Sequence, residues 1–271
     1  MIGIFDSGYG GLTIMNGITK KLPQYDYLYL GDNGRYPYGN RSKETVIKFT
    51  EQAVEHLFKA GCRLVIIACF TASSQALREI QEKYLRNPKS PYKDRKILGV
   101  LLPVVEKAAV MSKKNRIGVV ATRGTVASNS FEIELQKLRP GIAVLQQACP
   151  LLVPLIEEHW HEKPEAKMIL KKYLRPLKTM HPDTLILGCT HYSYLAKDFK
   201  RLMGKNVEIV DPPEVVAQSL MQYLERHPEI EKQLTKGGKK IFETTDNAEK
   251  FQSFWIQSFG AKVADCKKVT L

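Results

Sequence analysis

Two stretches decide the fold: Leu185-Ile186-Leu187-Gly188-Cys189-Thr190-His191 and its earlier counterpart, Leu64-Val65-Ile66-Ile67-Ala68-Cys69-Phe70-Thr71. Each is a short apolar run that ends in a small residue and a cysteine, and a helical pattern follows. In a chain that alternates strands and helices, such a run predicts a buried parallel strand with the cysteine at its end. Ligands of open α/β sheets bind at this carboxyl edge. The stretches therefore predict a cleft with one thiol on each wall.

A structural alternative exists for Cys69 and Cys189, because free cysteines are among the most buried residue types. Each is closely followed by a threonine, however, and Cys189 also by His191. Two thiols in matched positions with such neighbours favour chemistry over packing. The helix after Cys69 is expected to begin near Ala72. Proximity to a helix N-terminus lowers the pKa of a thiol, so we expect Cys69 to be reactive.

The composition is that of an ordinary globular protein, with 271 residues, of which 44% are hydrophobic and 25% charged. No apolar run reaches the roughly 18 residues that a membrane span needs. The N-terminal residues enter a strand directly and lack the regions of a signal peptide. The five cysteines are scattered and form no CxxC pair, which favours a reduced, cytoplasmic protein over a disulfide scaffold or a zinc site. Three are expected to be structural or surface thiols: Cys62, Cys149 and Cys266.

The net charge of +13 comes from Lys and Arg residues along the whole chain. Such a charge supports weak, salt-sensitive binding to nucleic acids. The sequence holds no helix-turn-helix, zinc-finger or RNA-binding signature that would specify such a partner. A solvated basic surface therefore explains the charge better than a nucleic-acid site.

Apolar runs of strand length alternate with helical patterns, from a strand at Ile2–Phe5 to a helix at Ala248–Phe259. The alternation predicts an α/β protein with two similar lobes, each a mostly parallel sheet flanked by helices, and an active site in the cleft between them. The expected division is 1–96 for the first part of lobe 1, 97–210 for lobe 2, and 211–271 for a return to lobe 1 and a C-terminal tail.

The first strand ends in a glycine-rich turn, Asp6-Ser7-Gly8-Tyr9-Gly10-Gly11. The turn has neither the GxGxxG spacing nor the lysine of a P-loop, so we expect no nucleotide site. Asp6 itself has two interpretations. It is either the N-cap of the following helix or a carboxylate at the strand edge of an active site.

A cleft with a thiol on each wall suits one reaction in particular. One sulfur removes a proton from one face of a carbon, and the other returns a proton to the opposite face. Such acid–base work needs pKa values tuned by neighbours, and His191 and Asp6 are the natural candidates. His159 and His161 lie close to Glu157 in the sequence, but they complete no tetrahedral ligand set, so we expect no metal.

Five motifs occur in order along the chain, and together they resemble the glutamate racemases of the aspartate/glutamate racemase superfamily over roughly residues 2–260. They are Asp6-Ser7-Gly8-x-Gly10-Gly11; Gly31-Asp32 with Arg35-x-Pro37-Tyr38-Gly39; Ala68-Cys69-x-Thr71-Ala72-Ser73; Cys149-Pro150 with Val153-Pro154 and Glu157; and Gly188-Cys189-Thr190-His191-Tyr192. The resemblance implies a cofactor-independent enzyme that supplies D-glutamate for peptidoglycan, and typically a homodimer.

The resemblance also implies a role for each matching residue. Cys69 and Cys189 match the catalytic thiols on opposite faces of the substrate Cα. Asp6 matches the carboxylate that assists Cys69, whereas His191 and Glu157 assist Cys189. The substrate-binding positions are Asp6, Ser7, Tyr38, Gly39, Phe70, Thr71, Thr190 and His191.

Three positions depart from the family pattern. Phe70 replaces the asparagine of the usual Cys-Asn-Thr and cannot make the hydrogen bonds of an amide, which leaves aspartate or another amino acid open as the substrate. Ser193 replaces a usual proline, and His159 replaces a frequent glycine. A further alternative is a non-catalytic binding or regulatory protein on the same scaffold. Contact with DNA gyrase, which some glutamate racemases inhibit, would be compatible with the basic charge, although we do not expect it.

Overall fold

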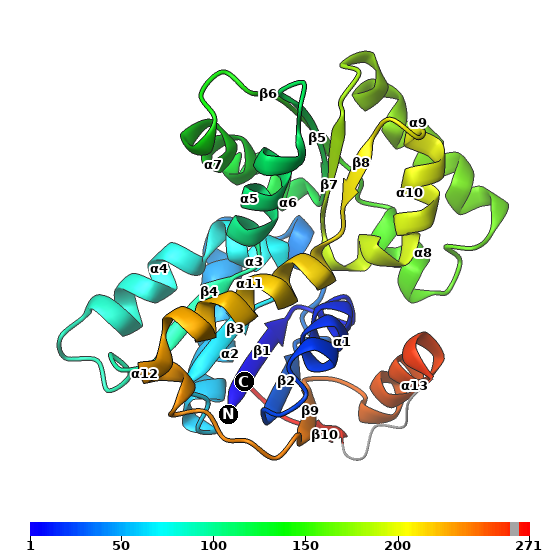
Figure 1. Ribbon diagram of the computed structural model, residues 1–271. Helices are drawn as coiled ribbons and strands as arrows, with labels where there is room; N and C mark the ends of the chain where they lie inside the picture. Colours follow the sequence, from blue (N-terminus) through cyan, green and yellow to red (C-terminus); the bar gives the residue numbers. More distant parts are fainter. Residues whose placement is uncertain (261–265) are drawn as a thin grey trace.

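The computed structural model describes residues 1–260 and 266–271. Two parallel sheets form two lobes that lie against each other (Figure 1). The larger sheet has the order β10-β9-β2-β1-β3-β4 and the smaller one β6-β5-β7-β8. The strands are β1 (Ile2–Asp6), β2 (Tyr27–Gly31), β3 (Leu64–Ile67), β4 (Lys96–Gly99), β5 (Arg116–Ala121), β6 (Ala143–Ala148), β7 (Thr184–Gly188), β8 (Glu208–Val210), β9 (Lys240–Thr244) and β10 (Cys266–Lys268).

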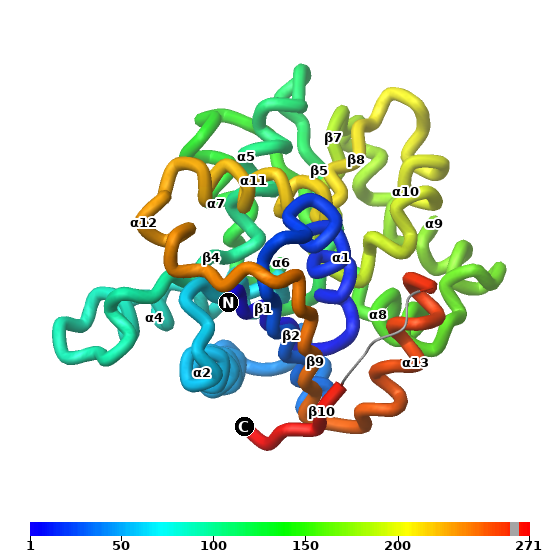
Figure 2. Tube along the Cα trace, turned by 60° about the horizontal axis from the view of Figure 1, so that its bottom comes forward, coloured from blue at the N-terminus to red at the C-terminus, as the bar shows by residue number. Residues whose placement is uncertain are grey.

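Helices flank both sheets, and the chain visits the lobes in turn. It builds β1 to β4, crosses to β5 to β8, and returns through α11, which contacts α1 and α5 between the lobes (Figure 2). The helices are α1 (Gly11–Lys21), α2 (Lys43–Lys59), α3 (Phe70–Gln75), α4 (Leu77–Gln81), α5 (Leu101–Met111), α6 (Arg123–Ala127), α7 (Ser130–Leu138), α8 (Leu152–Glu157), α9 (Pro164–Thr179), α10 (Ala196–Met203), α11 (Pro212–Arg226), α12 (Pro228–Glu231) and α13 (Ala248–Phe259). Short 3-10 helices cover Tyr38–Asn40 and Thr190–Leu195, and a π-helix covers Glu82–Arg86.

Alternate side chains of the central strands enter different apolar clusters. Ile4 and Ile66 contribute to a cluster that extends into lobe 2 and includes Val119 of β5. Phe5 and Val65 face the opposite side of the sheet, in a cluster that α2 covers. This alternation follows from the two-residue period of a strand. The shared cluster joins the lobes through continuous apolar packing.

The predicted fold class is confirmed, because both sheets are parallel and flanked by helices. The division at 96 and 210 stays a proposal. Strand pairing assigns all of β4 to the larger sheet, so that sheet continues beyond the first proposed boundary. The strand β10 has no counterpart among the sequence predictions. Among the described residues, no helix combines the length and apolar character that crossing a membrane requires.

Candidate active site

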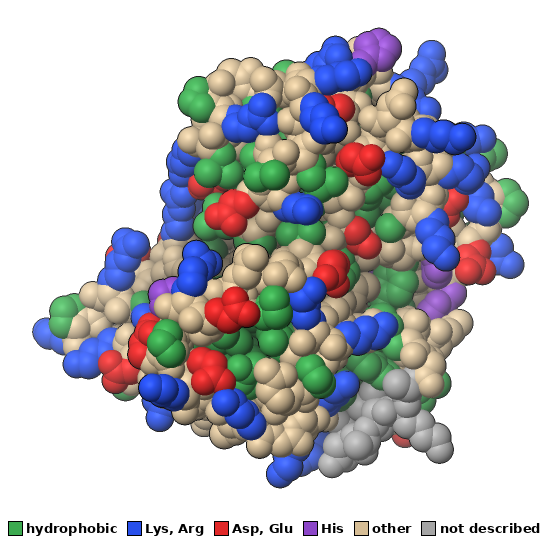
Figure 3. All heavy atoms as spheres, viewed as in Figure 1, with side chains coloured by type: hydrophobic (Ala, Val, Ile, Leu, Met, Phe, Trp, Pro, Cys, Tyr) green, Lys and Arg blue, Asp and Glu red, His purple; other side chains and the backbone are tan. Residues whose placement is uncertain are grey.

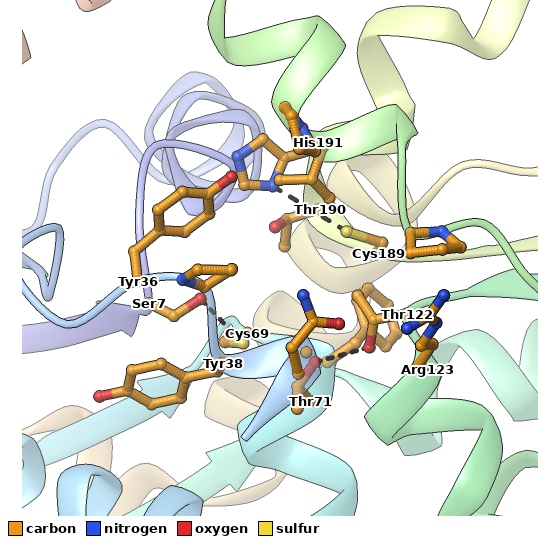
Figure 4. A pocket seen from close by; sticks show the side chains of 17 residues that line it. Ser7, Tyr36, Tyr38, Cys69, Thr71, Thr122, Arg123, Cys189, Thr190 and His191 are labelled. Carbon is orange, nitrogen blue, oxygen red and sulfur yellow. Dashed lines mark hydrogen bonds between the residues drawn. The ribbon is translucent and has the colours of Figure 1, made fainter.

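The two thiols face one pocket between the lobes, with about 560 Å³ of empty volume (Figure 4). Cys69 follows the buried strand β3, and Cys189 directly follows β7. Each is only 6% exposed. The strand-end pattern thus led to the correct juxtaposition, one thiol from each lobe.

Cys69 lies on the lobe-1 side of the pocket, where its Sγ is 3.3 Å from the hydroxyl of Ser7. It is the N-cap residue of α3, which begins at Phe70, slightly earlier than expected. Burial, together with the nearby Asp6 carboxylate, raises the pKa of Cys69 to about 12. The prediction of a lowered pKa for Cys69 is therefore wrong. Desolvation and a like charge outweigh the stabilisation of a thiolate by Ser7 and the amide of Ala72.

Asp6 is completely buried and connects the two lobes. Its carboxylate accepts hydrogen bonds from the amide of Gly8, at 2.9 Å, and from the hydroxyl of Thr190, at 3.3 Å. Gly10, rather than Asp6, is the N-cap residue of α1, so the helix-capping interpretation is wrong. Burial raises the pKa of Asp6, while His191 and the hydrogen bonds act in the opposite direction.

Cys189 lies beside a buried histidine–carboxylate pair. The Nδ1 atom of His191 is 3.9 Å from the Cys189 sulfur, and its Nε2 atom is 2.8 Å from Oε1 of Glu157. Burial alone would lower the pKa of His191, but hydrogen bonds to Cys189 and Glu157 reverse this effect and raise it to about 10. The raised pKa favours the protonated form of His191. A cation beside a thiol favours the thiolate form.

The glycine-rich turn after β1 makes room for Thr190, His191 and Glu157 of lobe 2. A Cβ on Gly10 would lie 2.3 Å from both Nδ1 of His191 and the Thr190 hydroxyl. A Cβ on Gly8 would lie 3.4 Å from the Glu157 carboxylate. The absence of side chains at these glycines therefore lets the segment that contains Thr190 and His191 pack directly against the turn. The glycine pattern of the turn did not by itself predict this contact between the lobes.

Tyr38 and Gly39 line the pocket as the resemblance implies, but the ring of Tyr38 points away from it (Figure 4). Its hydroxyl donates to Asp32, which also pairs with Arg35 at 2.7 Å. Gly39 packs against lobe 2, where an added Cβ would be 2.7 Å from Cβ of Thr122. This loop therefore offers the pocket its backbone at Tyr38 and Gly39.

Thr71 faces the pocket from α3 and hydrogen-bonds hydroxyl groups of lobe 2. Its Oγ1 atom is 2.9 Å from that of Thr122 and 3.3 Å from that of Thr125. The strand-end rule that singled out Cys189 could also have found Thr122 and Arg123, since both follow β5 at the same sheet edge. Residues that line the pocket but were not predicted as site residues are Tyr36, Pro37, Asn40, Thr122, Arg123, Pro150, Val153 and Pro154.

Phe70 contributes to the pocket wall, but its ring is part of the interlobe packing. It is 1% exposed and stacks on Phe131 of α7, with ring centroids 5.9 Å apart and an interplanar angle of 27°. Phe131 in turn leaves no space for a side chain at Gly188, where a Cβ would be 2.8 Å from its ring. The residue that replaces the usual asparagine thus supports the junction of the lobes.

His159 and His161 are packing residues in this structure. His159 has a φ of 57°, which explains why the family often has glycine here, and its ring packs on Phe254 with centroids 5.3 Å apart. Within the described residues, no group of three or more His, Cys, Asp or Glu side chains could hold a metal ion.

Comparison with known proteins agrees with this geometry. Residues 11–220 match the family model described as Asp/Glu/Hydantoin racemase. The chain is 35% identical to a glutamate racemase from Geobacter metallireducens over 270 residues, covering 100% of this chain and 96% of that protein. Its structure resembles a glutamate racemase isoform from Bacillus anthracis, with a TM-score of 0.90, 33% identity, and coverage of 100% and 97%. It also resembles the Francisella tularensis glutamate racemase in complex with D-glutamate, with a TM-score of 0.87, 31% identity, and coverage of 99% and 97%.

Proposed function

The chain belongs to the Asp/Glu/hydantoin racemase family, and we propose that it interconverts L- and D-glutamate with two cysteines and no cofactor. It is an amino-acid racemase, hence an isomerase. The observation that carries the mechanism is the pair of thiols in one pocket, one of them beside the buried pair of His191 and Glu157. Glutamate is favoured over aspartate because the full-length relatives are named glutamate racemase.

In the proposed reaction, one cysteine acts as a thiolate and takes the Cα proton from one face of glutamate. The other acts as a thiol and gives its proton to the opposite face of the carbanion. The substrate gains and loses one proton, and the two sulfurs exchange protonation states. The opposite enantiomer uses the same groups in reversed roles, as microscopic reversibility requires.

The neighbours of the thiols are proposed to set these protonation states. Burial favours the thiol form of Cys69, whereas Cys189 has the Nδ1 atom of His191 3.9 Å from its sulfur. Asp6 and Ser7 would assist proton transfer at Cys69, whereas His191 and Glu157 would assist it at Cys189.

Polar groups around the pocket are proposed to bind glutamate, which carries two carboxylates and one ammonium group. The hydroxyls of Ser7, Thr71 and Thr190 and the backbone of Tyr38 and Gly39 would supply most contacts. Arg123 extends to the rim, where its positive charge would attract an acidic substrate. Phe70 would contribute through its backbone, because its ring is engaged with Phe131.

The proposed cellular role is the supply of D-glutamate for peptidoglycan synthesis in the cytoplasm. We further propose a homodimer, which light scattering would test by giving twice the mass of the 271-residue chain. A single-chain mass at micromolar concentrations would contradict the dimer without affecting the proposed reaction.

The function is tested by incubating the protein separately with L- and D-glutamate and separating the enantiomers on a chiral column. Both reactions should approach an equal mixture without an added cofactor. L-aspartate under the same conditions should react at least tenfold more slowly. Faster conversion of aspartate would make aspartate the substrate, and an inactive protein with both amino acids would contradict the proposal.

A further inference from the structure

Tyr36 is a lobe-1 residue whose ring packs on lobe 2. It lies in the loop between β2 and the 3-10 helix at Tyr38–Asn40, at the position that the family motif Arg35-x-Pro37 leaves unspecified. Its partly buried ring packs against the lobe-2 cluster that contains Val153, Ile156 and Cys189. Tyr36 therefore bridges the two lobes at the edge of the pocket.

The same ring lies beside the pair formed by His191 and Glu157. The ring centroids of Tyr36 and His191 are 6.5 Å apart, and the Tyr36 hydroxyl points towards the imidazole (Figure 4). A Cβ built on Gly8 would be 3.3 Å from the Tyr36 ring and 3.4 Å from Oε1 of Glu157. The Tyr36 ring and the Glu157 oxygen that binds His191 therefore both face the turn at Gly8.

Tyr36 can act only as a donor towards this carboxylate. Burial, followed by the charge of Glu157 and a hydrogen bond to it, raises the pKa of Tyr36 well above its ordinary value. The phenol therefore keeps its proton at any physiological pH. A neutral hydroxyl beside a largely buried carboxylate stabilises that carboxylate by donating to it.

We propose that Tyr36 is a positioning residue for Cys189: its hydroxyl holds Glu157 against His191 and so keeps the imidazole ring beside the sulfur. Glu157 needs such support because it is the last residue of the six-residue helix α8. Since Tyr36 belongs to lobe 1 and its partners to lobe 2, the arrangement exists only while the lobes are in contact. The expected effect of Tyr36 on turnover rests on the proposed racemase function, whereas its expected effect on the alkylation rate of Cys189 does not.

The first test measures thiol reactivity without any substrate. Iodoacetamide alkylation of Cys69 and Cys189 is followed by peptide mass spectrometry at pH 7.5 in the wild type and in Tyr36→Phe. The variant should alkylate Cys189 about five to tenfold more slowly, because the imidazole ring that assists loss of the thiol proton is no longer held beside the sulfur, and Cys69 should change less than twofold. A merely looser pocket would instead expose both thiols and accelerate both reactions.

Two further variants make the test specific. Tyr84→Phe is the matched control, since the Tyr84 hydroxyl also donates to a glutamate, Glu55 at 3.2 Å, outside the pocket. It should leave both alkylation rates unchanged. Glu157→Gln should slow Cys189 by itself, and adding Tyr36→Phe to it should produce less than a twofold further change. Independent, multiplicative effects of the two substitutions would overturn the proposal.

The second test uses turnover. Tyr36→Phe should lower kcat about tenfold with less than a threefold change in KM. The primary isotope effect of α-deuterated glutamate should rise only for the enantiomer from which Cys189 takes the proton. Unchanged alkylation of Cys189 overturns the inference whatever the substrate is. If the wild type does not racemise glutamate, but Tyr36→Phe still slows the alkylation of Cys189 selectively, only the proposed function is contradicted.

Discussion

At the scale of single residues, two cysteines in the same pocket have different surroundings. Cys69 lies with Ser7 and the buried Asp6, whereas Cys189 lies with a cation held by Glu157. In the proposed two-base mechanism, these different surroundings would suit the two thiols to opposite proton-transfer roles. The sequence led to both thiols, but the pKa of Cys69 depends on burial, which strand and helix patterns do not reveal.

The cysteines give the first prediction. Cys69→Ser and Cys189→Ser should each lower racemisation by about 10³-fold or more, because a serine hydroxyl is far too weak an acid to form the needed anion, and acid–base groups typically contribute about 10²–10⁴-fold. Polarimetry with each enantiomer measures the loss. Cys62→Ser, which changes a buried thiol outside the pocket, is the control and should retain activity within threefold. Racemisation by either pocket variant at more than a tenth of the wild-type rate would contradict the two-cysteine mechanism.

His191 gives a second prediction, for the free energy of unfolding. Its pKa is about 10 in the folded protein and about 6.5 in an unfolded chain, so the folded state binds the extra proton between these values. The stabilising contribution is fully present below pH 6.5 and is lost as the pH rises towards 10. It should decline by up to about 1.4 kcal/mol per pH unit in that window.

Urea titrations of the wild type and His191→Gln between pH 6 and 10 measure this contribution. The difference between the two free energies should shrink as the pH rises, since the other titrating groups are common to both proteins. A constant difference across this range would mean that His191 is neutral in the folded state.

At the scale of elements, strand ends bring the chemistry together. β1, β3, β5 and β7 all direct their following residues to the pocket, and this could be predicted from apolar runs in an alternating chain. The contacts between elements could not. Gly10 lies against His191, and Tyr36 interacts with Glu157, although the members of each pair are far apart in sequence. Local sequence patterns do not reveal such contacts.

The glycine-rich turn gives a third prediction. Gly10→Ala has no backbone strain, because φ at Gly10 is −59°, but its methyl group would overlap His191 and Thr190. Displacement of these residues should lower kcat at least 100-fold, as positional errors of about 1 Å can. Steady-state kinetics at 20 °C measures this effect.

Gly204→Ala is the complementary control for that substitution. Gly204 has a φ of 95° and open space around its Cα, so alanine there should cost about 1–3 kcal/mol of stability without altering kcat. Equal losses of activity in the two variants would show that destabilisation, rather than the position of His191, explains the result.

At the scale of the whole molecule, apolar packing holds the lobes in register. Phe70 and Phe131 stack across the junction, and the apolar cluster around them continues into both sheets. From the motifs, Phe70 could be identified as a departure from the family's asparagine, but its expected role was in substrate binding. In the structure the ring stacks on Phe131, a contact that sequence spacing alone does not reveal.

This stack gives a fourth prediction. Phe70→Ala should lower the free energy of unfolding by about 3–5 kcal/mol, as is usual for a buried phenylalanine. A double-mutant cycle with Phe131→Ala should give a coupling of about 0.5–1.5 kcal/mol, measured by urea denaturation. Additive losses would show that the two rings stabilise the lobes independently.

The positive charge is also a property of the whole molecule. On the face shown in Figure 3, Lys and Arg side chains are spread over both lobes, with Asp and Glu between them. This distribution is compatible with the interpretation of a solvated basic surface. Contact with gyrase or DNA stays an untested alternative.

The most direct measurement is proton NMR of L-glutamate and, separately, D-glutamate with the protein in heavy water. The two-base account predicts that the Cα proton signal disappears in both samples and that the opposite enantiomer accumulates carrying deuterium at Cα. Persistent Cα proton signals in both samples, or conversion that retains the original proton, would contradict proton exchange through two thiols on opposite faces.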